Sequence, residues 1–170
     1  HNCDYTQWPT YEDGVELIAA AGESGKKLFW HRKHANEGLP GKRFIYESGI
    51  IGWAALDWEV DHNRIHSVFE AFSAKGTTQS ENLRIHDNLF DKLLDNAVEF
   101  EDSAQNMSVY RNVVRDTFSP ISWQPLRGKP LPGPGFVYQN VFYNTPEHLE
   151  TFGFRKTAVF KILGPCYGKI

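Results

Sequence analysis

This sequence of 170 residues is poor in cysteine, in charge of one sign and in long apolar runs. Its two cysteines, Cys3 and Cys166, stand near opposite ends, so neither a CxxC pair nor a disulfide framework indicates a redox compartment. The 18 basic and 21 acidic residues leave a formal net charge of −3, too small an imbalance to attract nucleic acid by counterion release. No apolar run approaches the roughly 20 residues of a membrane-spanning helix, and the start lacks the features of a signal peptide. We expect neither a nucleic-acid nor a membrane partner.

The composition is that of a folded protein. Hydrophobic residues make up 41% of the chain, enough to bury a core, and we expect one domain over residues 1–170. Because the chain does not begin with Met, we also expect it to be a segment of a longer protein.

A repeat organises the chain. Four segments read apolar residue, two polar residues, Asn, and then an alternating apolar stretch; they are residues 60–65, 85–90, 109–114 and 137–142. Their asparagines are 25, 24 and 28 residues apart by subtraction of their numbers; they are Asn63, Asn88, Asn112 and Asn140. Asn tolerates left-handed backbone angles, so each segment predicts a strand, a tight bend and a second strand. Stacked copies predict an asparagine ladder.

Further strand-like pieces follow the bends at residues 69–72, 97–100 and 121–124, and residues 14–18 have the same character. This pattern predicts an all-β solenoid of about five to six turns, with residues 89–98 containing a loop or one helical turn. Two stretches rich in Gly, at residues 19–42 and 125–135, predict long inserted loops. An antiparallel β-sandwich also has short alternating strands, but it does not place Asn at one phase of such a period.

The phrases NLRIHDNLF, NMSVYRNVV and GFVYQNVFYNT resemble repeats of the pectate-lyase-like family. The resemblance runs from about Trp58 to Thr145, with a weaker extension back to Asn2. It implies a right-handed parallel β-helix, a polysaccharide or oligosaccharide partner, and an extracellular or periplasmic location. It does not name a reaction, because the family includes lyases, hydrolases, epimerases, tailspikes and adhesins, and no catalytic motif of the family matches this chain.

Carboxylates are the first candidates for catalysis. In members of the family, sugar lies in a groove along one parallel sheet. If Val15, Phe69, Val98 and Ile121 point inward, the outward row of that sheet contains Glu16, Glu70 and Glu99. Adjacent turns lie about 4.8 Å apart, close to the spacing of a retaining hydrolase pair, and the same carboxylates could bind Ca²⁺. The alternative is a solvated acidic face with salt bridges.

A basic loop is the second candidate. His31 could carry a proton near neutral pH, while four neighbours could bind substrate; these are Trp30, Arg32, Lys33 and His34. Lyases need such charge neutralisation beside a base. A solvated loop without a ligand is the alternative.

Histidines also recur near the bends, at His62, His66 and His86, where imidazoles more often bond backbone than metal, so we predict no metal site. An N-terminal His is the defining ligand of copper-dependent polysaccharide monooxygenases. Asn2, however, falls at the ladder position, which makes His1 the remnant of a missing strand.

The sequence therefore predicts a polysaccharide lyase or glycoside hydrolase that needs no cofactor except possible Ca²⁺. A non-catalytic carbohydrate-binding, adhesive or structural β-helix is the alternative, and the copper monooxygenase is a minor one.

Overall fold

The computed structural model describes residues 1–20, 41, 48–51, 54–74, 80–101, 104–124, 133–152 and 158–162. Within these residues, no helix is both long and apolar enough to cross a membrane.

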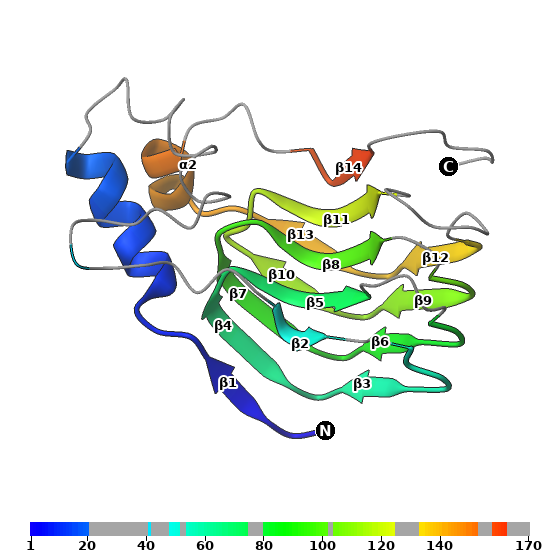
Figure 1. The fold of residues 1–170 in the computed structure, drawn as a ribbon. Coiled ribbons are helices and arrows are strands. Elements are labelled where there is room, and N and C mark those ends of the chain that lie inside the picture. The colour runs from blue at the N-terminus through cyan, green and yellow to red at the C-terminus, as the bar shows by residue number, and fades with distance from the viewer. Residues whose placement is uncertain are drawn as a thin grey trace.

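Short strands form three parallel sheets (Figure 1). Sheet A has the order β1 (Asp4–Thr6), β4 (Arg64–Val68), β7 (Leu89–Leu93), β10 (Val113–Arg115) and β13 (Val141–Tyr143). Sheet B has the order β14 (Phe160–Ile162), β11 (Ser119–Gln124), β8 (Asn96–Glu101), β5 (Glu70–Ala74) and β2 (Ser48–Ile51). Sheet C has the order β12 (Gly135–Tyr138), β9 (Met107–Tyr110), β6 (Arg84–His86) and β3 (Glu59–Asp61).

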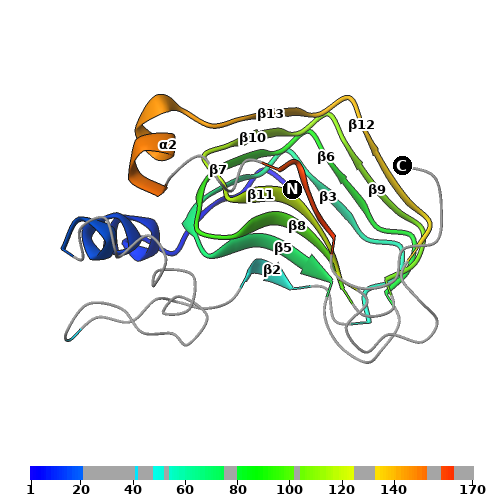
Figure 2. The ribbon, with the colours of Figure 1, turned by 90° about the horizontal axis from the view of Figure 1, so that it is seen from above.

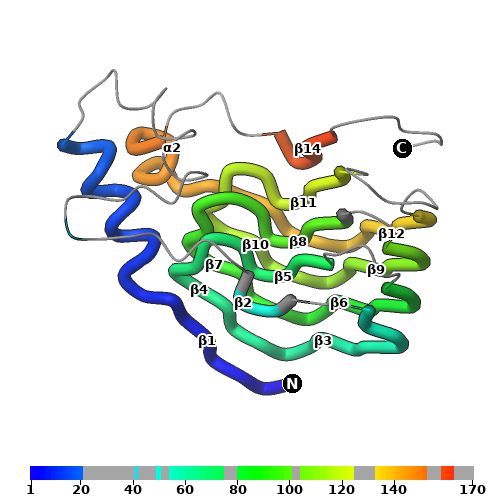
Figure 3. Tube along the Cα trace, in the orientation of Figure 1, coloured from blue at the N-terminus to red at the C-terminus, as the bar shows by residue number. Residues whose placement is uncertain are grey.

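The chain passes through sheets C, A and B in turn and then climbs to the next strand of each, so the fold is a parallel β-solenoid. Viewed from above, the three sheets form the sides of each turn (Figure 2). About three turns are complete, namely β3–β5, β6–β8 and β9–β11, so the expectation of five to six turns is wrong. The end turns are interrupted: a helix follows β1, and α2 (Pro146–Phe152) separates β13 from β14 (Figure 3).

In the complete turns, the corners between sheets C and A and between sheets A and B each contain a residue in the left-handed conformation. Between sheets C and A these residues are His62, Asp87, Arg111 and Gln139, with φ between 52° and 55°. Between sheets A and B they are Ser67, Lys92 and Asp116, with φ between 52° and 58°. This conformation is uncommon for a residue such as Arg, and the bidentate contact of Arg111 with Asp87 on the neighbouring turn stabilises it there.

Asparagines form a hydrogen-bonded column directly after the corner between sheets C and A. Asn63 Nδ2 donates to Asn88 Oδ1 at 3.1 Å, Asn88 Nδ2 to Asn112 Oδ1 at 3.0 Å, and Asn112 Nδ2 to Asn140 Oδ1 at 3.0 Å. The backbone N–H of each of the first three donates to the same oxygens. Because Asn63, Asn88 and Asn112 are at most 5% exposed, the column supplies partners to polar groups that solvent does not reach.

The main core lies between the three sheets and contains residues such as Ile65, Phe90 and Val114 from neighbouring strands of sheet A. A second cluster lies beside it, where the helix of residues 10–20 packs against α2. The strand expected at residues 14–18 is therefore wrong. Tyr11 and Ile18 are spaced i and i+7, which places both on one face of a helix.

Residues 89–98 are also not a loop or a helical turn: they contain β7 and the start of β8. Leu93 and Leu94, adjacent in sequence and fully buried, contribute to different clusters. The spacing of Phe90, Leu93, Leu94 and Ala97 resembles that of one helix face, but these residues belong to two different cores.

Candidate functional site

The structure does not assemble the carboxylate row expected from the sequence. Glu16 lies exposed on the helix of residues 10–20, whereas Glu70 and Glu99 lie on β5 and β8 of sheet B. Glu99 is the register partner of Ser73, three residues beyond Glu70. Three residues of strand span about 10 Å, so Glu70 and Glu99 are not the cross-turn pair that was expected.

The two carboxylates on sheet B are also buried, at 3% exposure for Glu70 and 2% for Glu99, so the expectation of a solvent-facing row is wrong. Phe72 and Val98 pair in register and fill the core. Ser73 and Glu99 therefore face the other side of sheet B, where the Ser73 hydroxyl donates to Glu99 Oε2 at 3.0 Å. The expected row assumed that Phe69 points into the core beside Val98. In β5 that core position is occupied by Phe72 instead.

The basic loop falls outside the described residues. His31, Trp30, Arg32, Lys33 and His34 all belong to it, so their expected roles stay predictions. The same holds for most of residues 19–42 and 125–135.

A different set of side chains lies together on the outward face of sheet C. Parallel register aligns Asp61 with His86, Tyr110 and Tyr138 on successive turns. His1 extends this column. Residues of β1 pair with residues of β4 that are 60 positions later in the chain, and the same spacing of 60 relates Cys3 to Asn63 and His1 to Asp61. We call these residues the outward column: His1, Asp61, His86, Tyr110 and Tyr138.

His86 is the most connected member of the outward column. Its Nδ1 lies 2.7 Å from Asp87 Oδ2 and its Nε2 lies 2.8 Å from Glu59 Oε1. A neutral imidazole has one N–H, so both contacts are hydrogen bonds only when both nitrogens carry a proton. The hydrogen bonds from His86 and then Arg84 lower the pKa of Glu59.

Arg111 completes this network from the next turn. Its Nε donates to Asp87 Oδ1 at 2.8 Å and its Nη2 to Asp87 Oδ2 at 2.5 Å, a bidentate pair across 24 residues of sequence. Hydrogen bonds from Arg111 and then His86 hold the pKa of Asp87 well below its ordinary range. The guanidinium also lies 4.8 Å from the centroid of the Tyr110 ring.

The aromatic members of the column stack on one another. The rings of His86 and Tyr110 are 4.6 Å apart, and those of Tyr110 and Tyr138 are 5.0 Å apart with an interplanar angle of 1°. Tyr138 covers Tyr110 with one ring face and is 47% exposed. Other outward residues of this turn are exposed and apolar as well; they are Phe136, Val141 and Tyr143, at 49%, 54% and 47%.

The outward face thus changes from ionic to apolar along the solenoid. Glu59, Arg84, Ser108 and Phe136 occupy one register position on successive turns, and Arg64, Leu89, Val113 and Val141 occupy another. We call the exposed set Phe136, Tyr138, Val141 and Tyr143 the aromatic turn.

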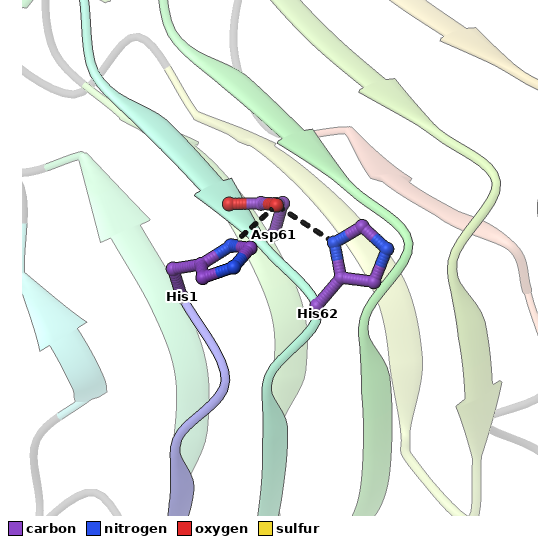
Figure 4. Close-up of side chains that lie close together, drawn as sticks. All are labelled: His1, Asp61 and His62. Carbon is purple, nitrogen blue, oxygen red and sulfur yellow. Dashed lines mark hydrogen bonds and ion pairs between the residues drawn. The ribbon is translucent and has the colours of Figure 1, made fainter.

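The other end of the column contains a cluster of possible metal ligands. Nδ1 of His1 and Nδ1 of His62 each lie 2.7 Å from Asp61 Oδ2 (Figure 4). Within the described part of the chain, this is the one group of three His, Cys, Asp or Glu side chains whose ligand atoms all lie close enough to hold a metal ion, within 4.8 Å of one another.

The sequence pattern did not predict this cluster, because it put Asn2 at the ladder position. In the structure Cys3 occupies that position: its N–H donates to Asn63 Oδ1 at 3.0 Å. Asn2, with φ of 56°, is the left-handed corner residue, one position earlier. This shift by one residue brings His1 to Asp61 and makes it a structured member of the outward column.

No family model, curated protein or solved structure matches this chain.

Proposed function

We propose that this chain is a carbohydrate-binding β-solenoid that binds polysaccharide on the aromatic turn, with the exposed face of the Tyr138 ring as the main stacking surface. The observation that carries the proposal is the position of four exposed apolar side chains on the outward side of β12 and β13. Contiguous exposed apolar groups on a folded chain commonly mark a binding surface. The apolar C–H face of a sugar ring fits the flat face of Tyr138.

The ring of Tyr138 is well suited to this role because its own position is fixed. Its stacking on Tyr110, and that of Tyr110 on His86, leaves little freedom of rotation to lose when a ligand binds. Polar groups lie beside the ring at the neighbouring corner, where Gln139 is exposed and Arg111 is about half exposed. Hydroxyl groups of a sugar could form hydrogen bonds there.

Binding is favoured over hydrolysis by the positions of Glu70 and Glu99. Within the described residues, Glu70 and Glu99 are buried and are not register partners. A glycosidase needs two carboxyl groups that flank the scissile bond and reach it. A polysaccharide ligand would also be consistent with an extracellular or periplasmic location.

The proposal is tested by binding assays on a panel of soluble neutral and uronic-acid polysaccharides, using affinity electrophoresis followed by calorimetry on any ligand found. We expect the chain to bind at least one of them, and Tyr138→Ala to weaken that binding by tenfold or more. Assays for reducing sugar and for unsaturated chain ends run in parallel report hydrolase and lyase activity.

Trp58→Ala is the matched control, because Trp58 is 42% exposed and lies just before β3, at the other end of sheet C. It removes an exposed aromatic ring without touching the aromatic turn, so its affinity should equal that of the parent. A parent chain that binds no polysaccharide, or equal losses in Tyr138→Ala and Trp58→Ala, would refute the proposal.

A further inference from the structure

We propose that His1, Asp61 and His62 form a binding site for a divalent transition-metal ion, and that Zn²⁺ is the ion this donor set fits. The site lies at the end of sheet C opposite the aromatic turn and is independent of carbohydrate binding there. Two imidazole nitrogens converge on one carboxylate oxygen at 2.7 Å each, with both rings open to solvent. The His1 and His62 side chains are 64% and 55% exposed, and that of Asp61 is 15% exposed.

The backbone brings these three donors together. Asp61 ends β3, and His62 is fixed in the left-handed conformation of the corner, with φ of 55°. The pairing of β1 with β4 places His1 beside them, and two hydrogen bonds hold Cys3, which lies between His1 and β1: Cys3 N–H donates to Asn63 Oδ1, and Arg64 N–H donates to Cys3 O at 2.8 Å. The donors therefore approach one another before any ion is present.

The next turn contains the same pair of residue types in reverse order, His86 followed by Asp87, with the same contact of 2.7 Å between Nδ1 and Oδ2. There the pair is saturated: Glu59 contacts the second nitrogen of His86, and Arg111 binds both oxygens of Asp87. At Asp61 and His62 the third partner is another imidazole, that of His1, and both imidazoles face water. One turn thus has a closed ionic network, and the other has a donor set with room for an ion.

The geometry suits zinc. Bonds of 2.0–2.2 Å to nitrogen and oxygen at tetrahedral angles put ligand atoms about 3.3 Å apart. The separations of 2.7 Å between each imidazole nitrogen and Asp61 Oδ2 would lengthen by about 0.6 Å on metal binding, a change that exposed side chains can make by small rotations. Three protein ligands leave the fourth position to water. Ca²⁺ and Mg²⁺ require six or more ligands, mostly oxygen, and this cluster offers one carboxylate.

The test is titration of the metal-free full chain with Zn²⁺, by calorimetry and by competition with a chromophoric chelator, with thermal unfolding recorded in parallel. We expect one Zn²⁺ per chain and a rise in Tm with zinc concentration, as for any ligand that binds the folded state alone. Asp61→Asn and His62→Gln should each weaken zinc binding by tenfold or more without loss of the fold, since neither removes a core side chain. Ca²⁺ should not raise Tm.

His66→Gln is the matched control, since His66 lies on β4 near Asp4 and outside the cluster. It should bind zinc as the parent does. Adding two residues before His1 moves the α-amino group away from the site but leaves the His1 imidazole in place. This extended chain should still bind zinc. The site would be refuted if the parent bound no zinc, if His66→Gln and His62→Gln lost equal affinity, or if the extension abolished binding, which would assign the ion to the α-amino group.

Discussion

Arg115 binds Asp91 on the neighbouring turn of the solenoid through two parallel hydrogen bonds, from Nε to Oδ1 at 2.8 Å and from Nη2 to Oδ2 at 2.6 Å. The Asp91 side chain is 3% exposed, whereas the Arg115 side chain is 37% exposed. The hydrogen bond from Arg115 to the Asp91 carboxylate raises the pKa of Arg115, so the guanidinium is charged near neutral pH. The ion pair with Arg115 therefore offsets the free-energy cost of burying the Asp91 carboxylate.

We expect Arg115→Met to lower the free energy of unfolding by about 2–3 kcal/mol, measured by urea denaturation. Loss of one partner of a buried ion pair typically costs ~3–5 kcal/mol, and the partial exposure of Arg115 reduces this. Adding Asp91→Asn should restore part of the loss, because it removes the unpaired charge. Arg111→Met, at an exposed pair of similar geometry, should change stability much less; an equal loss there would contradict the argument from burial.

The asparagine column should be sensitive to loss of a single donor. Asn88 Nδ2 contacts Val60 O at 2.9 Å, His86 O at 2.8 Å and Asn112 Oδ1 at 3.0 Å. Asn88→Asp keeps the shape and the accepting oxygen but removes these donors, so we expect a loss of about 2–3 kcal/mol by urea denaturation.

Asn106→Gly serves as the control for this substitution. Asn106 donates to Asn82 Oδ1 at 2.6 Å on the exposed side of another corner, and glycine tolerates its φ of 50°. Its effect should stay well below that of Asn88→Asp. Similar losses in the two variants would mean that burial of the column contributes little.

The sequence was informative where the repeat was unbroken. The intervals between Asn63, Asn88 and Asn112 equal the register offsets between β4, β7 and β10, since one side chain contacts its own successor in each turn. In segments outside the stacked turns there is no repeat interval against which a local pattern can be compared. Residues 14–18 alternate like a strand, but Tyr11 and Ile18 lie on one buried face of a helix, and the Tyr11 ring packs against Phe152, 141 residues away by subtraction.

The candidate site shows the same limit in its register. A shift of three residues on β5 separates Glu70 from Glu99, and a shift of one residue at Asn2 brings His1 to Asp61. Neither shift is visible in spacing, because a strand pairs by its backbone and its side chains only favour one register. The two pairs of neighbouring His and Asp residues, Asp61-His62 and His86-Asp87, are visible in the sequence. Which further side chains contact each pair is not, because those contacts come from Glu59, Arg111 and His1 on other parts of the chain.

Gly135 begins β12 beneath a large ring. A Cβ at this position would lie 2.6 Å from Trp123 Cζ3 and 3.1 Å from Phe100 Cε1. The ring centroids of Trp123 and Phe100 are 5.3 Å apart, so a Trp123 ring displaced toward Phe100 would press on it. We expect Gly135→Ala to lower stability by about 1–3 kcal/mol in thermal unfolding, the usual cost of overpacking. Adding Trp123→Phe should recover part of the loss, and no recovery would place the strain in the backbone instead.

His148 is expected to make the stability of the protein depend on pH. It is 4% exposed and lies between the rings of Tyr11, Phe118 and Phe152, with its Nδ1 2.8 Å from the Tyr11 hydroxyl. Burial lowers its pKa to about 4, despite the opposing effects of Asp116 and the Thr117 backbone. In the folded protein the ring is therefore neutral at pH 6, where Nδ1 can accept the hydrogen bond from Tyr11.

The unfolded chain should protonate His148 near its ordinary pKa of ~6.5. Between about pH 6.5 and 4 the unfolded state consequently binds a proton that the folded state does not, so the stability due to neutral His148 is complete above this window and is lost as the pH falls through it. We expect a loss on the order of 2 kcal/mol between pH 7 and pH 5, measured by urea denaturation. His148→Gln cannot titrate there and should show a smaller loss by that amount. Equal pH dependence in the two proteins would show that His148 is not the group responsible.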